Sequence, residues 1–262
     1  MNSDHLREAR TIANRLSEAW GLNLGPTLPG ASCSLVLEAD QDRVLKVPFP
    51  HAEEASAWQT VQAFNGHGGV KLLRHDAETG AMLMPRLRPG TTLDTSSLSD
   101  LRQVDVCAEL ILKLRAAPVV EGISLARWYF ELDEMADSQL VRQARHVYAD
   151  LQSYAGSPAL LHGDMHHFNI LRHGDSWVVI DPKGLVGDPS FEVVGFMRNP
   201  IGNTPGAAGM RARLERFSER LGDPIERLWG WAFTQTVLCT SSPSSFAGAC
   251  ERAAEAIWEA RP

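Results

Sequence analysis

Cysteine is scarce in this sequence and follows no recognisable pattern. The four cysteines, Cys33, Cys107, Cys239 and Cys250, include no Cys-x-x-Cys pair. That spacing is typical of zinc ribbons, and a regular set of cysteines is typical of disulfide frameworks. We therefore expect a protein with reduced thiols that resides in the cytoplasm.

Long apolar runs and an excess of basic residues are also missing. No stretch reaches the roughly 18 to 20 apolar residues that a membrane-spanning helix requires, and residues 1–20 are charged and amphipathic, unlike a signal peptide. The 25 Lys and Arg residues are outnumbered by 32 Asp and Glu residues, which gives a net charge of −7. We expect neither nucleic acid nor a membrane as a partner, and no obligate protein partner is indicated.

The patterning of apolar residues predicts two unlike halves. The chain has 262 residues, of which 44 % are hydrophobic, so it is long enough for two lobes. The predicted elements are helices at 3–20, 52–64, 98–115 and 138–154, strands at 33–39, 43–49, 70–75 and 80–84, and further helices from residue 191 onward. We predict an α+β fold with a β-rich lobe at 1–84, a hinge at 85–92 and a mostly helical lobe at 93–262.

One stretch in the second half is unusually rich in polar, chemically active residues. It is "LLHGDMHHFNILRHGDSWVVIDPKG", residues 160–184. Residues 169–173 and 177–181 are predicted to be two strands of a hairpin. Because the strands are antiparallel, Asn169 and Asp181 are expected at the same end of the hairpin. Asp164 lies five residues upstream in a loop, where catalytic groups are common.

These residues predict a phosphoryl-transfer centre. A carboxamide and a carboxylate oxygen suit Mg²⁺, which takes one or two such ligands together with phosphate and water. The spacing His-x-Asp-x-x-x-x-Asn, followed by a later Asp, is that of kinase catalytic loops and is matched by His162, Asp164, Asn169 and Asp181. We predict Asp164 as the catalytic base and Asn169 and Asp181 as the metal ligands.

Two other interpretations of the same stretch stay open. His162 and His166 are four residues apart, with His167 adjacent, and imidazoles at that spacing bind zinc when they share a helix face. Gly163 and the flanking strands disfavour a helix here. The remaining alternative is a polar loop without chemistry.

The predicted β-rich lobe contains a lysine and a carboxylate that fit a nucleotide site. Lys46 lies on the strand at 43–49, where a cation for the α- and β-phosphates of a nucleotide is expected. Glu53 and Glu54 open the next predicted helix, and either is a possible partner for Lys46. We take Glu54 as the candidate, although the sequence alone does not distinguish the two.

Two turns complete the predicted nucleotide site. The segment "PGASCS" contains Ser32 and Ser34, and its small side chains allow backbone N–H groups to approach phosphate oxygens. The segment "MLMPRL" contains Pro85 and Leu87 and is predicted to be the hinge whose backbone binds adenine.

Taken together, these segments resemble a known family. "LLHGDMHHFNILR" and "WVVIDPKGLVGDPSFEVVGFMRNP", with the segments around Lys46, are similar to the aminoglycoside 6-phosphotransferase and hydroxyurea phosphotransferase family, over about residues 30–200. The resemblance implies a two-lobed protein-kinase-like fold, ATP and Mg²⁺ as cosubstrate and cofactor, and transfer of the γ-phosphoryl group to a hydroxyl of a small molecule. Pro85 departs from the family, in which a Glu is expected in the hinge.

The resemblance also directs the choice of substrate. Aminoglycosides are polycations, so carboxylates are expected in their pocket, and we predict Asp188 and Glu192 as substrate-binding residues. Arg198 is an alternative partner for Glu192. The predicted reaction is phosphorylation of an aminoglycoside such as streptomycin. The alternatives are a kinase of hydroxyurea or of a metabolite alcohol, and a nucleotide-binding protein without catalysis.

Overall fold

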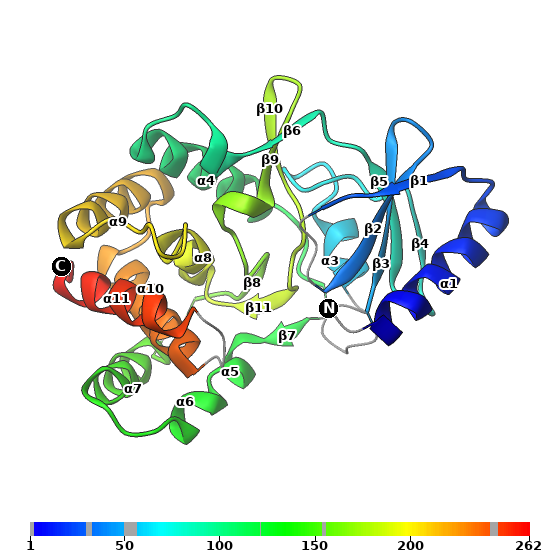
Figure 1. The fold of residues 1–262 in the computed structure, drawn as a ribbon. Helices are drawn as coiled ribbons and strands as arrows, with labels where there is room; N and C mark the ends of the chain where they lie inside the picture. The colour runs from blue at the N-terminus through cyan, green and yellow to red at the C-terminus, as the bar shows by residue number, and fades with distance from the viewer. Residues whose placement is uncertain (1–2, 30–32, 50–56, 121, 154–155, 242–245) are drawn as a thin grey trace.

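A five-stranded antiparallel sheet forms one side of the molecule in the computed structural model (Figure 1). The structure describes residues 3–29, 33–49, 57–120, 122–153, 156–241 and 246–262. The strand order is β1-β2-β3-β5-β4. The strands are β1 (Leu24–Thr27), β2 (Ser34–Ala39), β3 (Arg43–Pro48), β4 (Arg74–Asp76) and β5 (Ala81–Pro85).

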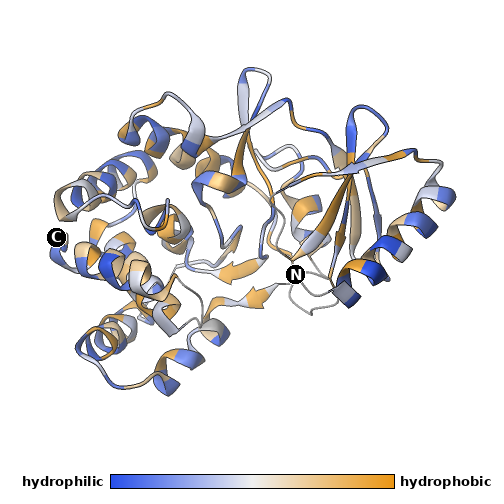
Figure 2. Cartoon of the chain, in the orientation of Figure 1, coloured by the Kyte–Doolittle hydropathy of each residue, from blue (hydrophilic) through white to orange (hydrophobic). Residues whose placement is uncertain are grey.

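This sheet is buried on both faces because a helix covers each of them. On β5, Ala81 and Leu83 pack under α1 (Ser3–Trp20), whereas Met82 and Met84 pack with α3 (Ala57–Ala63) on the opposite face. The alternation follows from the two-residue period of a strand. The hydropathy colouring in Figure 2 shows polar and apolar residues on α1, as expected for an amphipathic helix.

The same alternation places Lys46. On β3, Leu45 and Val47 belong to the core under α1, so Lys46 lies on the α3 face, where it is in register with Met82 of β5. That face looks toward the helical half of the molecule (Figure 1).

Two smaller sheets lie between the five-stranded sheet and the helices (Figure 1). The first has the order β10-β9-β6, with β6 (Pro89–Thr92), β9 (Ile170–His173) and β10 (Ser176–Val179). The second has the order β7-β11-β8, with β7 (Ile123–Ser124), β8 (Ala159–Leu161) and β11 (Leu185–Gly187). β8 and β11 pair with each other directly before and after residues 162–184, and β9 and β10 lie within this segment.

Helices form the other side of the molecule and enclose the largest core. The α-helices are α4 (Asp100–Leu114), α5 (Leu125–Trp128), α6 (Phe130–Glu134), α7 (Gln139–Leu151), α8 (Val194–Met197), α9 (Ala207–Leu221), α10 (Ile225–Leu238) and α11 (Ala247–Glu259). Short 3₁₀ turns are η1 (Leu93–Thr95), η2 (His167–Asn169), η3 (Pro189–Val193) and η4 (Cys239–Ser241). In the described part of the chain, none of the helices has the length and apolar character to cross a bilayer.

The predicted α+β architecture is confirmed, with errors in short elements. The helix at 3–20 and the strands at 33–39 and 43–49 agree with α1, β2 and β3. The strand predicted at 70–75 is wrong in extent, because β4 covers only Arg74–Asp76, and β1, β6 and the β7-β11-β8 sheet were not predicted. The lobe boundaries at 84 and 93 remain a proposal, and the proposed hinge at 85–92 contains β6, which pairs with β9.

Candidate active site

The β9–β10 hairpin brings Asn169 and Asp181 to one end, as its antiparallel pairing requires. Val179 pairs with Ile170, and the Ile180 amide donates to the Asn169 carbonyl at 2.9 Å. Asp181 then leaves the hairpin with a positive φ of 61°. This left-handed conformation is uncommon for a residue other than glycine.

Lys46 reaches this end of the hairpin from the five-stranded sheet. Its Nζ lies 3.0 Å from Oδ1 of Asp181, across 135 positions of sequence. The lysine side chain is 6 % exposed and the aspartate side chain 41 % exposed. The ion pair therefore combines a buried cation with a carboxylate that solvent or a metal ion can reach.

Asp164 lies in the loop between β8 and η2 and is held by a partly buried arginine. Nη2 of Arg198 donates to Oδ1 of Asp164 at 3.1 Å, and Nε2 of His166 lies 3.5 Å from Oδ2. Burial would raise the pKa of Asp164, but the contacts with His166 and Arg198 outweigh burial and leave the pKa below its usual value. Asp164 is consequently ionised at neutral pH.

The side-chain amide of Asn169 is turned toward Asp164. Its Nδ2 donates to the Asp164 carbonyl at 3.1 Å and lies 3.2 Å from Nε2 of His166. Asn169 and Asp164, which one spacing pattern links in the sequence, are thus in direct contact. Lys46, chosen by a separate argument, contacts Asp181 of the same pattern.

His162 supports the loop from inside the protein. Its Nε2 donates to the Ile180 carbonyl at 2.7 Å, and its Nδ1 accepts from the Asp164 amide at 3.2 Å. Burial lowers the pKa of His162 to about 4, so the ring is neutral at pH 7. The imidazole ties the Asp164 loop to the end of β10.

Glu192 supports the same loop from the opposite side. Its two carboxylate oxygens each accept a backbone N–H, from His162 and from Gly163, at 2.8 Å. Burial raises the pKa of Glu192 to about 7, against the two N–H donors, which favour the ionised form. Glu192 is 3 % exposed, and Arg198 pairs with Asp164 and not with Glu192.

Asp188 is also used internally. It accepts from the Ser190 amide at 2.9 Å, which caps η3, and from Nε1 of Trp231 at 2.6 Å, and it pairs with Arg227. The substrate contacts expected for Asp188 and Glu192 stay a prediction. In the structure both carboxylates are buried and their oxygens bond groups of the protein, so they hold elements in place.

The remaining predicted nucleotide-site residues are only partly described. Ser32, Glu53 and Glu54 lie outside the described residues. Ser34 is buried in β2 opposite Pro48 of β3, and Pro85 ends β5 opposite Arg43. Leu87 packs against the cluster that contains Met82 and Met84. Their nucleotide contacts stay a prediction.

The donor atoms at the site fit a hard cation and do not fit zinc. Asn169 and Asp181 supply oxygen ligands, which Mg²⁺ prefers, and leave positions for phosphate and water. His162 and His167 are fully buried, and both ring nitrogens of His162 bond backbone groups. Across the described ranges, His, Cys, Asp and Glu side chains form no group of three or more that could hold a metal ion.

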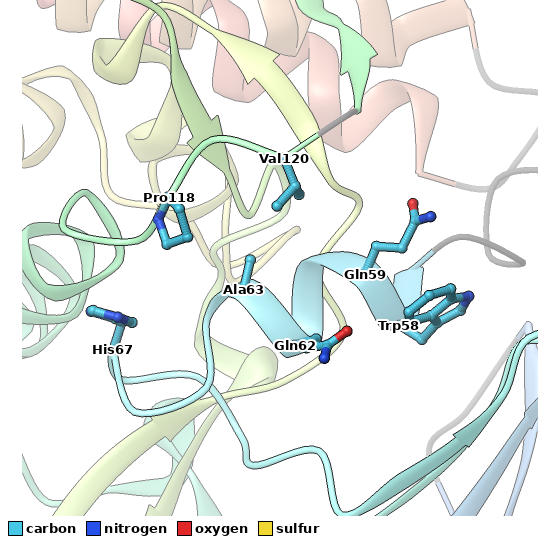
Figure 3. Close-up of a pocket in the computed structure, with 7 residues that line it drawn as sticks. All are labelled: Trp58, Gln59, Gln62, Ala63, His67, Pro118 and Val120. Carbon is cyan, nitrogen blue, oxygen red and sulfur yellow. The ribbon is translucent and has the colours of Figure 1, made fainter.

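A cavity is lined by residues of α3 together with residues from later in the chain (Figure 3). It has a volume of about 530 Å³, and its lining residues are Trp58, Gln59, Gln62, Ala63, His67, Pro118 and Val120. Since no Lys, Arg, Asp or Glu is among them, this cavity is unsuited to a nucleotide phosphate, and the site remains at the β9–β10 hairpin.

Two contributions at the site were not predicted from the sequence. Arg198 as the partner of Asp164 and Glu192 as the holder of the loop both stand in the apolar run "FEVVGFMRNP". A charged residue in such a run is expected to be buried together with a partner. The apolar run therefore marks Glu192 and Arg198 as candidates, but it does not show which groups they contact.

Comparison with known proteins gives consistent matches. The sequence model described as aminoglycoside/hydroxyurea antibiotic resistance kinase matches residues 27–244. The streptomycin 6-kinase of Streptomyces glaucescens is 28 % identical over 243 residues, which cover 85 % of this chain and 78 % of that protein. The hydroxyurea phosphotransferase of Kitasatospora aureofaciens is 32 % identical, over 84 % of this chain and 68 % of that protein.

Solved structures share the fold. A thermostable mutant of aminoglycoside phosphotransferase APH(4)-Ia, in ternary complex with ADP and hygromycin B, superposes with a TM-score of 0.65. The superposition covers 94 % of this chain and 97 % of that chain, at 17 % sequence identity. At that identity the likeness concerns the fold alone, and the fold is the one the resemblance implied.

Proposed function

Because the chain belongs to the aminoglycoside/hydroxyurea antibiotic resistance kinase family, we propose that it transfers the γ-phosphoryl group of ATP, with Mg²⁺, to a hydroxyl group of an aminoglycoside of the streptomycin type. The observation that carries the proposal is the contact of Lys46 with Asp181 at 3.0 Å, beside Asp164 and Asn169. This is the residue set that phosphoryl transfer requires. Membership of the family by itself supports kinase activity on a small molecule, without identifying that molecule.

Each residue has a role in an in-line transfer. Lys46 would bind the α- and β-phosphates, and Asn169 and Asp181 would hold Mg²⁺, which would neutralise phosphate charge. Asp164 accepts a hydrogen bond from the acceptor hydroxyl and takes its proton as the new P–O bond forms. The bond from the γ-phosphorus to the β–γ bridging oxygen breaks at the same time, and ADP leaves. Arg198 donates to the carboxylate of Asp164 and holds it in place, which suits a group that positions the nucleophile. No covalent intermediate with the protein is needed.

Streptomycin is proposed as the acceptor because relatives of this chain are named streptomycin 6-kinase, and an activity assay tests this choice. Purified protein with ATP and Mg²⁺ is incubated with streptomycin, other aminoglycosides, hydroxyurea and simple metabolite alcohols, and ADP release is measured. We expect turnover with streptomycin and a phosphorylated product by mass spectrometry. One relative is named as a hydroxyurea phosphotransferase. Turnover with hydroxyurea and none with aminoglycosides would support the proposed kinase activity and contradict the proposed acceptor.

The base role of Asp164 has a matched control in the same hairpin region. Asp164→Asn is expected to lower kcat by about 10² to 10⁴, the usual contribution of general base catalysis, with little change in nucleotide affinity. Asp175→Asn, at the exposed turn between β9 and β10, should leave both unchanged. Equal turnover in Asp164→Asn and the natural protein would remove Asp164 from the mechanism. If neither protein turned over any substrate, a nucleotide-binding protein without catalysis would be favoured instead.

A further inference from the structure

His166 lies between the proposed base and one proposed metal ligand. Its Nε2 is 3.2 Å from Nδ2 of Asn169 and 3.5 Å from Oδ2 of Asp164. Its Nδ1 is buried and has no hydrogen-bond partner in the part of the chain that the structure describes. The polar contacts of the ring are therefore directed at Asn169 and Asp164.

The partners of Asn169 decide which of the two contacts is the hydrogen bond. Nδ2 of Asn169 is 3.1 Å from the backbone carbonyl of Asp164. A carbonyl can only accept, so the amide nitrogen, and not the amide oxygen, must occupy this position. The second hydrogen of Nδ2 then points to Nε2 of His166, which accepts it. The contact from Nε2 to Asp164 is too long for a good hydrogen bond, and Arg198 already bonds that carboxylate at 3.1 Å.

Fixing the nitrogen of a planar amide also fixes its oxygen. With Nδ2 bonded to the Asp164 carbonyl and to His166, Oδ1 of Asn169 is turned away from both acceptors. A hard cation coordinates Oδ1 and does not coordinate the amide nitrogen. If His166 could not accept a hydrogen bond, only the bond from Nδ2 to the Asp164 carbonyl would hold the amide. A rotation that exchanges the amide oxygen and nitrogen would then break one hydrogen bond and not two.

We infer that His166 is a positioning residue that holds Oδ1 of Asn169 in the orientation required for metal binding. The inference rests on the proposed function, in which Asn169 and Asp181 hold the divalent cation. His166 would contact neither the metal nor the acceptor. Residues that orient metal ligands in this way affect metal affinity by about 10- to 100-fold when they are replaced.

The test measures metal binding without turnover. Mn²⁺ is titrated into the full chain saturated with the non-hydrolysable analogue AMP-PNP, and free Mn²⁺ is followed by electron paramagnetic resonance. His166→Phe keeps an aromatic ring near Phe168, which His166 contacts edge to face at a centroid distance of 5.7 Å, but it removes the acceptor. We expect Mn²⁺ affinity to fall by about 10- to 100-fold. His166→Gln restores an acceptor and should remain within about threefold of the natural protein.

The outcomes separate this inference from the function on which it rests. His146→Phe, on the exposed side of α7, is the control and should bind Mn²⁺ normally. Unchanged Mn²⁺ affinity in His166→Phe, or a loss in His166→Gln as large as in His166→Phe, would overturn the inference. Absence of Mn²⁺ binding to the natural protein with AMP-PNP would instead overturn the proposed function. If His166→Phe does not fold, His166→Ala compared with His166→Gln gives the same decision.

Discussion

His167, in the 3₁₀ turn η2 of the candidate site, is buried without polar contacts to described residues that would explain its burial. It is fully buried, and neither ring nitrogen has a hydrogen-bond partner in the described part of the chain. Its ring stacks on Phe196 with centroids 4.0 Å apart. Burial, assisted by the charge of Arg213, lowers the pKa of His167 to about 3. The folded protein therefore holds the ring neutral.

Replacement of His167 by Phe should stabilise the protein. A buried polar group without a partner costs about 1–3 kcal/mol, and Phe keeps the stacking on Phe196, so we expect His167→Phe to raise the free energy of unfolding at pH 7 by about 1 kcal/mol. Urea unfolding monitored by circular dichroism measures this change. A lower stability of His167→Phe at pH 7 would show that the ring nitrogens make contacts that matter.

The same variant should change how stability depends on pH. Because the pKa of His167 is lower in the folded state than its ordinary value of 6.5, the unfolded chain binds the proton first as the pH falls. The free energy of unfolding therefore declines from pH 6.5 downward, by at most about 1.4 kcal/mol per pH unit for one group. His167→Phe should make this decline shallower between pH 6.5 and pH 5, and an equally steep decline in the variant would show that His167 does not cause it.

At the scale of elements, α3 and β7 meet at the loop that carries Asp181. Gly184 has a φ of +70°, and a Cβ placed there would lie 2.4 Å from Oγ1 of Thr60 on α3. The Gly184 carbonyl accepts from the Ile123 amide of β7 at 3.1 Å. The loop that follows Asp181 is thus packed between two elements that are far apart in sequence.

Gly184→Ala should disturb this packing, and Gly174→Ala provides the matched control. Gly174 has a φ of +55°, with nothing within 4 Å of a built Cβ, so its replacement carries only the backbone cost of about 1 kcal/mol. Gly184→Ala adds a clash worth about 1–3 kcal/mol, and it should also lower kcat/KM because the loop holds Asp181. Urea unfolding and the ADP-release assay measure both effects. Equal losses in the two variants would show that the contact with Thr60 is unimportant.

Sequence patterns predicted the elements and residues whose signals are local. α1, β2 and β3 were predicted because their apolar periods are long, and Asp164, Asn169 and Asp181 because a fixed spacing links them. β1, β6 and the β7-β11-β8 sheet have strands of two to four residues, which are too short for a periodic signal. The pairing of Arg198 with Asp164 spans 34 positions and depends on tertiary packing, which no local pattern encodes.

At the scale of the whole molecule, Lys46 and Asp181 join the two halves. Lys46 belongs to the five-stranded sheet, and Asp181 follows the β9–β10 hairpin. The chain passes from β5 to β6 through only three residues, 86–88. A nucleotide with its metal that contacted Lys46 and Asp181 would link both halves, so its binding energy would add to the stability of their arrangement.

Nucleotide binding should therefore raise the melting temperature, and Lys46 should be required for the rise. Ligand at about 100 times its Kd adds about 2.7 kcal/mol to stability, so ADP with Mg²⁺ should raise Tm by several degrees in the natural protein. In Lys46→Met we expect most of this shift to disappear, measured relative to the Tm of each variant without ligand. Lys113→Met is the control, since Lys113 is half-exposed on α4 and pairs with Glu109. An equal ADP-dependent shift in Lys46→Met and Lys113→Met would mean that the nucleotide binds without Lys46 and does not link the two halves through it.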